Sequence, residues 1–271
     1  MTDDPMFTSR EGTTPLLISI PHGGTELPEA IAATLTPEAR ALPDTDWHVG
    51  RLYEFAAGLG AGLIAARASR YVVDLNRPSD GRSLYPGQAT TGLVPTETFD
   101  GAPVYRPGPV PALAEIARRV ETYWRPYHAA LRERVERIRS RFAVAVLWEA
   151  HSIRSVVPRL FDGRLPDFNL GTNDGASADP GLVARVQAVA AVSGYSSALN
   201  GRFKGGFITR SCGQPATGIQ AIQLELAQAT YMDEAPPYAY RSDLAARVQA
   251  PIRAMLEAVL AWLGETGATR G

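Results

Sequence analysis

Five short apolar runs constrain the fold more than any other feature of the sequence. They are LLISI (16–20), GLIAA (62–66), RYVVDL (70–75), FAVAVLWE (142–149) and GIQAIQLEL (218–226). Each run is nearly continuous in apolar character and is bounded by polar residues or glycine. This is the pattern of strands that are buried on both faces of a sheet. We therefore predict five buried strands, and such a sheet needs helices on both of its faces.

Helical patterns lie between and after these runs, over residues 46–60, 111–142, 179–194 and 242–264. In the first, Asp46 is placed as a cap and Gly60 as a stop. In the second, Pro126 should break or kink the helix, because proline has no N–H donor and clashes with the preceding turn. Strands that alternate with helices predict an α/β protein, with a three-layer α/β/α architecture around a mixed, mostly parallel sheet.

The length of 271 residues and the hydrophobic content of 45% allow one large core. We expect a single domain over residues 1–271, with residues 1–14 as an N-terminal tail. The region 76–110 is rich in Pro, Gly and Thr and has little periodicity. Long loops of this kind usually shape a ligand site, so we expect an active-site excursion there.

Charge and cysteine content limit the function. The net charge of −1 argues against a nucleic-acid partner, because phosphate neutralisation needs a surplus of basic residues. Cys212 is the only cysteine, so neither an internal disulfide nor a thiolate metal cage is available. The apolar runs are too short to cross a membrane, and the start MTDDPMFTSREG lacks the pattern of a signal peptide. We expect a cytoplasmic protein with a small-molecule ligand and no membrane partner.

Chemically active residues follow four of the five runs. In an open α/β sheet, ligands bind beyond the carboxyl ends of the strands. The residues found there are His22; Asp74, Asn76 and Arg77; Glu149, His151, Ser152 and Arg154; and Glu225. Charged groups are rarely buried without a partner or a purpose, so this edge of the sheet is the predicted functional site.

Two of these residues, His22 and His151, are candidate metal ligands. Two imidazoles, one carboxylate and an open position are typical of a catalytic zinc site. Asp46, His48 and Glu26 are the candidates for the third ligand. Asp46 could instead cap a helix, and a lone histidine after a strand often serves in a turn.

The arginines near the strand ends suit an anionic substrate. The pair Asn76–Arg77 offers a fork for a carboxylate, although Arg77 could instead form an ion pair with Asp74. Arg154 and Arg210 are further candidates for a second carboxylate.

Two carboxylates remain for the chemistry of the site. Glu225 would be a general base if it faces a metal, or an interior carboxylate satisfied by an arginine if it does not. Glu149 lies two residues before His151 and would point to the same side of a strand, where it could orient that histidine.

Several longer motifs resemble the N-formylglutamate amidohydrolase family. They are SIPHGGTELP, DTDWHVGRLY, SRYVVDLNRP, LYPGQATTGLVPTETFDG, WEAHSIRSVVPRLFDGRLPDFNLGTNDGAS, LNGRFKGGFITR and QLELAQATYMDE. The resemblance extends from about Pro15 to the last helix. It implies a phosphorylase/hydrolase-like fold, similar to zinc-dependent exopeptidases and aspartoacylases, whose DLNR string recurs at residues 74–77.

The resemblance also implies roles for individual residues. His22 and His151 match the zinc histidines. Asn76 and Arg77 match the substrate-binding pair, and Glu225 matches the carboxylate that activates water.

The third metal ligand departs from the exopeptidase pattern. Those relatives have a glutamate three residues after the first histidine, where this chain has Thr25. We therefore favour Asp46 as the third ligand, with His48 in reserve and Glu26 as a more distant choice.

The resemblance implies hydrolysis of N-formyl-L-glutamate to formate and L-glutamate, the last step of a histidine degradation route. The cofactor would be a divalent metal, expected to be Zn²⁺, and the partner a small dicarboxylate amide, bound by a monomer or small homo-oligomer. The glycine-rich segments GRFKGG (201–206) and NLGTNDG (169–175) are predicted to close over the substrate.

Three alternatives stay open at this stage. One is a different N-acyl-amino-acid deacylase or a carboxypeptidase-like hydrolase on the same scaffold. The second is a non-catalytic binding protein for anionic metabolites. The third is a Schiff-base enzyme that would depend on Lys204, the only lysine.

Overall fold

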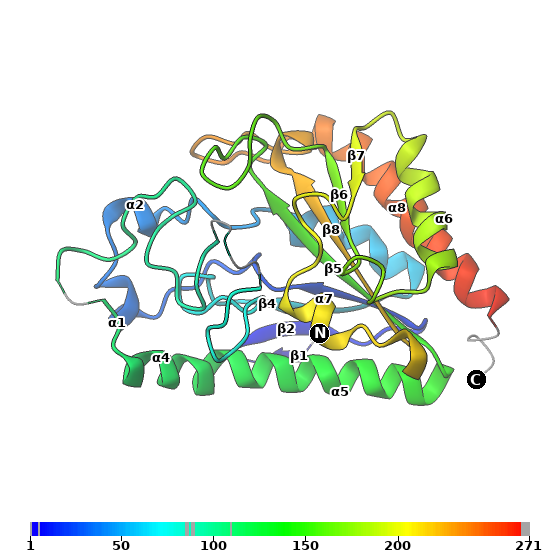
Figure 1. Ribbon diagram of the computed structural model, residues 1–271, viewed down its shortest axis with the longest axis horizontal. Coiled ribbons are helices and arrows are strands. Elements are labelled where there is room, and N and C mark those ends of the chain that lie inside the picture. Colours follow the sequence, from blue (N-terminus) through cyan, green and yellow to red (C-terminus); the bar gives the residue numbers. More distant parts are fainter. Residues whose placement is uncertain (1, 5, 85–86, 88–89, 109, 267–271) are drawn as a thin grey trace.

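The framework of the molecule is one mixed β-sheet. The structure is a computed structural model and describes residues 2–4, 6–84, 87, 90–108 and 110–266. In this part of the chain, eight strands form the sheet in the order β1-β2-β4-β3-β5-β8-β6-β7 (Figure 1). Their bounds are β1 Thr2–Asp4, β2 Phe7–Arg10, β3 Leu16–Ile20, β4 Gly62–Ala66, β5 Ala145–Ile153, β6 Phe168–Gly171, β7 Ser197–Leu199 and β8 Ile219–Ala227.

The centre of the sheet is parallel and its edges are mixed. Strands β4, β3, β5 and β8 pair with one another in parallel. At one edge, β1 and β2 are antiparallel to each other, and β2 is antiparallel to β4. At the other edge, β6 is antiparallel to β8, and β7 is parallel to β6. The predicted mixed, mostly parallel sheet is confirmed.

Helices cover both faces of the sheet. They are α1 Glu29–Ala32, α2 Pro37–Arg40, α3 Val49–Leu52, α4 Leu113–Arg119, α5 Arg125–Phe142, α6 Pro180–Ala191, α7 Phe207–Cys212 and α8 Ser242–Glu265. Short 3₁₀ segments occupy Glu54–Leu59, Pro215–Thr217 and Gln228–Thr230, and a π turn occupies Val120–Trp124. In the described part of the chain, no helix is both apolar enough and long enough to cross a bilayer.

Alternate residues of β3 show how the three layers form. Leu16 and Ile18 belong to the core that packs under α6 and α8, whereas Leu17 belongs to the core under α5. Ser19 also faces α5, where its hydroxyl lies 3.0 Å from the Tyr127 hydroxyl. In Figure 1, α4 and α5 lie along one side of the sheet, and α6 and α8 lie along the other. The predicted three-layer architecture is therefore confirmed.

Four of the five predicted strands are present, but the strand predicted over residues 70–75 is wrong. This segment forms turns, in which the Val72 N–H donates to the Ser69 carbonyl at 2.9 Å. The Arg70 guanidinium and the Asp74 carboxylate then meet at 2.7 Å, four residues apart. The apolar sequence Tyr-Val-Val suggested a strand with β-ladder hydrogen bonds, but the segment forms turns that are held by a buried ion pair.

The predicted helix 46–60 is also interrupted. It begins only after His48, which is the residue before α3, and it continues as a 3₁₀ segment to Leu59. Asp46 is not the cap that we expected, because its carboxylate accepts the Ser152 N–H at 3.1 Å. In the long helical region 111–142, Pro126 lies in the first turn of α5, where its missing N–H is tolerated. The π turn Val120–Trp124 immediately precedes it and interrupts the regular α-helical hydrogen bonds there.

Two further predictions need correction. Residues 1–14 are not simply a tail, since β1 and β2 lie there and the Phe7 side chain is buried against Tyr127. Strands β6 and β7 were not predicted, and β6 includes the start of the segment 169–175 that we expected to be a loop. The excursion 76–110 forms no helix or strand where it is described, and its residues 85–86, 88–89 and 109 lie outside the described residues, as do residues 1 and 5 of the expected tail.

Candidate metal and catalytic site

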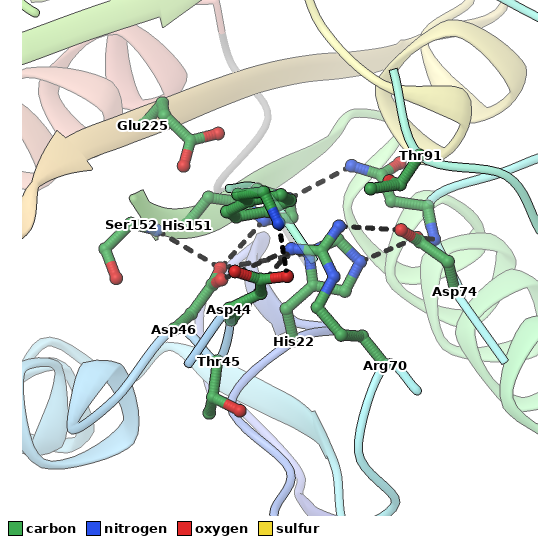
Figure 2. Close-up of polar contacts among 12 residues, drawn as sticks. His22, Asp44, Thr45, Asp46, Arg70, Asp74, Thr91, His151, Ser152 and Glu225 are labelled. Carbon is green, nitrogen blue, oxygen red and sulfur yellow. Dashed lines mark hydrogen bonds and ion pairs between the residues drawn. The ribbon is translucent and has the colours of Figure 1, made fainter. Parts of the chain in front are cut away.

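Two histidines come together at the carboxyl ends of β3 and β5. His22 lies two residues beyond β3, and His151 lies near the end of β5. Asp46 reaches both from the segment before α3, and its backbone N–H donates to the His22 carbonyl at 3.1 Å. Figure 2 shows the three side chains pointing toward one another. Residues more than 100 positions apart in the sequence thus form one cluster.

The cluster has the geometry of a metal site. Asp46 Oδ2 lies 3.1 Å from His151 Nδ1 and 3.9 Å from His22 Nδ1. One possible ligand atom from each of the three residues lies within 4.8 Å of the other two. All three side chains are buried. Among the residues that the structure describes, this His–Asp–His group is the one in which such atoms converge.

A carboxylate supports each histidine from behind. The Nε2–H of His22 donates to Asp74 Oδ1 at 2.8 Å, and the Nε2–H of His151 donates to Glu149 Oε1 at 2.9 Å. Glu149 is held in turn by Thr209, whose backbone N–H and hydroxyl donate to its other oxygen at 3.1 and 2.5 Å. Such carboxylate–histidine pairs fix the ring orientation and leave Nδ1 to face a metal.

The charges around the cluster shift the pKa values of its members. Burial lowers the pKa of His151, but the charges and hydrogen bonds of the surrounding carboxylates, with Glu149 foremost, together outweigh burial and leave this pKa well above 6.5. For His22, burial and then the charge of Arg70 lower the pKa. Burial acts to raise the pKa of Asp74, but His22 and Arg70 hold it well below its ordinary value. The Asp74 carboxylate therefore stays ionised and stabilises positive charge on His22 and Arg70.

The residues of the cluster fit a divalent cation. Asp46 Oδ1 is buried and, among the described residues, has no hydrogen-bond partner. Arg70 Nη1 lies 3.9 Å from this oxygen, beyond hydrogen-bond distance, and a buried carboxylate oxygen without a hydrogen bond is costly unless a closer cation or water satisfies it. Two imidazole nitrogens and one carboxylate oxygen are also the donor set of catalytic zinc sites.

A cavity opens beside the cluster. Its lining residues are His22, Arg70, Asn76, Arg77, Thr90, Thr91, Phe99, His151, Ser152, Ile153, Leu160, Arg202, Phe203, Gly206, Gln223 and Glu225. Three of them are arginines and one is acidic, so the cavity suits an anionic ligand. The cavity therefore joins the candidate metal ligands to cationic groups and to one carboxylate.

That carboxylate, Glu225, lies on β8 directly beside His151 of β5 in the sheet register. Burial raises the pKa of Glu225 to about 8. The Gln223 side-chain amide donates to Glu225 at 3.3 Å, and its own oxygen accepts the Gly206 N–H at 2.8 Å. A held carboxylate whose pKa lies near neutrality is suited to general acid–base catalysis.

The predicted pair Asn76–Arg77 lines the same cavity. Asn76 Oδ1 accepts the Ile208 N–H at 2.9 Å, and Asn76 Nδ2 lies 3.1 Å from His151 Nε2, whose proton is directed to Glu149. The Arg77 Nε–H donates to the Thr91 carbonyl at 2.9 Å. Both side chains are thus fixed by the backbone beside the cluster.

The structure places the two reserve ligands outside the cluster. His48 Nε2 donates to the Tyr238 carbonyl at 2.7 Å. Glu26 is exposed and forms an ion pair with Arg67 at 2.8 Å. Of the three candidates for the third ligand, the geometry therefore brings only Asp46 to the two histidines.

Two predicted arginines and Lys204 do not line the cavity. Arg154 contacts Asp100 at 2.8 Å, and the Arg210 Nε–H donates to the Gly205 carbonyl at 2.9 Å. Lys204 pairs with Asp174 at 3.1 Å, and its side chain is 40% exposed. The structure gives no support to Arg154 or Arg210 as a carboxylate clamp, or to a buried lysine nucleophile.

Arg70, Gln223 and Arg202 line the cavity but were not predicted to do so. Arg70 sits in the segment that the sequence suggested was a strand, so its position could not be inferred. Gln223 alternates with Glu225 along β8, and a period of two was the available signal. Arg202 lies in the GRFKGG segment, which its glycines marked as a loop.

The fold and the site define a class of protein. A three-layer α/β sheet, a buried His–Asp–His cluster at its carboxyl edge and a carboxylate across a cationic cavity are typical of a hydrolase. A model of one family matches residues 14–232, and its description is N-formylglutamate amidohydrolase. The chain belongs to this family.

Individual relatives agree with the family match. The chain is 59% identical to an N-formylglutamate deformylase of Pseudomonas aeruginosa, over 96% of this chain and 97% of the relative. It is 54% identical to an N-formylglutamate deformylase of Pseudomonas putida, over 97% and 98%. A crystal structure of an N-formylglutamate amidohydrolase from Ralstonia eutropha is similar, with a TM-score of 0.80 and 28% identity over 96% of this chain and 98% of that one.

Proposed function

We propose that the chain hydrolyses N-formyl-L-glutamate to formate and L-glutamate with the help of a divalent metal, Zn²⁺, held by His22, Asp46 and His151. The observation that supports this most is the buried cluster of these three side chains beside Glu225, in a member of this family. The names of the two Pseudomonas relatives support the substrate. The reaction would be the last step of a histidine degradation route, and we place it in the cytoplasm.

The metal and Glu225 have separate roles in the proposed reaction. When bound, a divalent metal supplies Lewis-acid polarisation of the formyl carbonyl and makes water more acidic. Glu225 takes the proton of the attacking water and later delivers it to the leaving nitrogen. Its burial, which raises its pKa to about 8, lets it act in both directions near neutral pH.

Cationic and polar groups of the cavity orient the substrate. Asn76 presents its NH₂ group, because Ile208 holds its carbonyl oxygen. Arg77 lies next to it, so the two offer donors to one carboxylate of the substrate. Arg70 also lines the cavity, and its charge stabilises negative charge that develops near the histidine cluster.

A formate-release assay tests this proposal. Purified protein should release formate from N-formyl-L-glutamate, lose this activity after chelation and dialysis, and recover it when one equivalent of Zn²⁺ is added. The variant H22A should bind less metal and show little activity, because it removes one of three ligands. Full activity in the metal-free protein would refute the metal role. Faster release of acetate from N-acetyl-L-glutamate than of formate would refute the acyl specificity.

A further inference from the structure

A third arginine of the cavity, Arg202, lies in the segment 201–206 rather than on the strand edge. Its Nε–H donates to the Leu160 carbonyl at 2.7 Å, and its guanidinium carbon lies 5.3 Å from the centre of the Phe203 ring. We infer that Arg202 binds the side-chain carboxylate of the substrate and thereby sets the preference for a glutamyl group. This inference rests on the proposed function and names the residue that selects its substrate.

The other cationic groups are arranged for different tasks. The Arg70 guanidinium is buried and lies 2.7 Å from Asp74 and 3.9 Å from Asp46, so it belongs to the charged groups around the histidine cluster. Asn76 lies 3.1 Å from His151, and Arg77 follows it in the chain. This pair is therefore close to the reacting centre.

The chemistry of N-formylglutamate assigns one carboxylate to each position. Its α-carboxylate is attached to the same carbon as the nitrogen of the bond that breaks, so it must stay near the reacting centre. The Asn76–Arg77 pair meets that requirement. The second carboxylate is two methylene groups farther from that carbon and needs a separate cation at a greater reach, and Arg202 is the remaining arginine of the cavity lining.

The wall around Arg202 suits those methylene groups. Ile153, Leu160 and Phe203 line the same cavity, and Arg202 contacts the last two of them. The same three residues belong to a small apolar cluster that also contains Phe99. A cavity that combines an apolar wall with a guanidinium group suits a short aliphatic chain that carries a carboxylate. Neither Arg154 nor Arg210 lines this wall.

Matched substrates test the inference, because N-formyl-L-glutamine replaces the side-chain carboxylate with a neutral group of the same shape. The wild-type protein should prefer N-formyl-L-glutamate in kcat/KM. In R202L, kcat/KM for N-formyl-L-glutamate should fall by about 100-fold or more, mainly through KM, since a charge-assisted contact is lost. For N-formyl-L-glutamine the change should stay within about fivefold, so the preference largely disappears.

Two further variants separate charge from packing. R202K keeps the charge but loses the planar fork, so it should recover about tenfold of the kcat/KM that R202L loses. R185L removes an exposed arginine that pairs with Glu265 between α6 and α8, and it should leave the preference unchanged. Titration calorimetry with L-glutamate and L-glutamine, which lack the formyl group and are not hydrolysed, adds a second readout. R202L should weaken binding of L-glutamate but not of L-glutamine.

The outcomes distinguish the two levels of the proposal. If R202L loses kcat/KM equally on both substrates, Arg202 only maintains the loop. If R202L keeps the wild-type kcat/KM on both substrates, Arg202 does not contact the carboxylate. Either result overturns the inference and leaves the proposed function intact. A wild-type protein with bound metal that releases formate from neither substrate overturns the proposed function itself, and the assignment of Arg202 falls with it.

Discussion

Replacing Glu149 with glutamine should weaken metal binding without removing any ligand. Glu149 is fully buried, with one oxygen on His151 Nε2–H and the other on the two donors of Thr209. Glutamine has only one acceptor oxygen. Because Thr209 supplies two donors and His151 one, we expect the amide oxygen to face Thr209. The amide NH₂ group then faces His151 Nε2 and favours the tautomer with its proton on Nδ1, the atom that should bind the metal.

The size of the effect follows from the role of the carboxylate. Loss of such a supporting group usually costs about 10- to 100-fold in metal affinity. This corresponds to about 1.4 to 2.7 kcal/mol of binding free energy. The assay is competition for Zn²⁺ between the metal-free protein and a chromophoric chelator of known affinity, at pH 7.5. A thermal melt of the metal-free variant shows how much the fold itself has changed.

The variant E136Q provides the matched control, since Glu136 is exposed on α5 and pairs with Arg139 at 2.8 Å. Its zinc affinity should equal that of the wild type. If E149Q binds Zn²⁺ within twofold of the wild type while its melting temperature falls, Glu149 only stabilises the fold. That result would refute the positioning role derived from the His151 contact.

Three more changes test other parts of the molecule. E225Q should keep one equivalent of metal but lose about 10²- to 10⁴-fold in kcat, the usual contribution of a general base, and near-normal turnover would exclude that role. Burial lowers the pKa of His128 to about 4, so the unfolded chain takes up a proton at this residue before the folded protein does as the pH falls. The contribution of His128 to the free energy of unfolding is therefore fully present above pH 6.5 and declines as the pH falls toward 4. The loss from this group is at most about 3 kcal/mol, and urea unfolding of H128Q should show a correspondingly weaker dependence on pH over that range; parallel profiles would contradict this. A Cβ at Gly206 would lie 2.2 Å from Asn76 Nδ2, so G206A should displace that amide and lower kcat/KM by about tenfold or more, whereas G264A on α8, with open space around it, should not.

The sequence was sufficient to predict the parallel centre of the sheet. The runs at β3, β4, β5 and β8 are apolar because helices cover both faces, and burial of this kind leaves a local signal. The segment 70–75 has a similar local composition but forms turns, because Arg70 finds Asp74 as a buried partner. Local hydrophobicity could not distinguish a strand from an apolar turn that contains an ion pair.

The edges of the sheet could not be predicted for a related reason. β2 has four residues and β7 has three, and none of the β7 residues is fully buried, so neither strand has a long apolar run. β6 is buried but short, and its Asn169 interrupts the apolar pattern. The existence of these strands depends on partners that lie far away in the sequence.

The residues of the candidate site divide in the same way: those beside apolar runs could be predicted, and those held by distant partners could not. The sequence points to His22, His151 and Glu225 because they follow or end apolar runs, and it favours Asp46 among three candidates. The supporting contact between Asp74 and His22 spans 52 residues, and that between Thr209 and Glu149 spans 60. Such contacts have no local signature, and the sequence around Arg202 indicates only a glycine-rich loop.

The position of β8 has a consequence for how the molecule is assembled. β8 lies between β5 and β6, although β6 and β7 precede it in the chain (Figure 1). The earlier strands can therefore form the parallel trio β4-β3-β5, but the unit β6–β7 cannot join that trio until β8 has been inserted. His22, Asp46 and His151 belong to the part that can form first, and Glu225 arrives with the inserted strand. A nascent chain that ends before residue 219 can thus gather the three proposed metal ligands, but it acquires the proposed base only when the sheet is joined across β8.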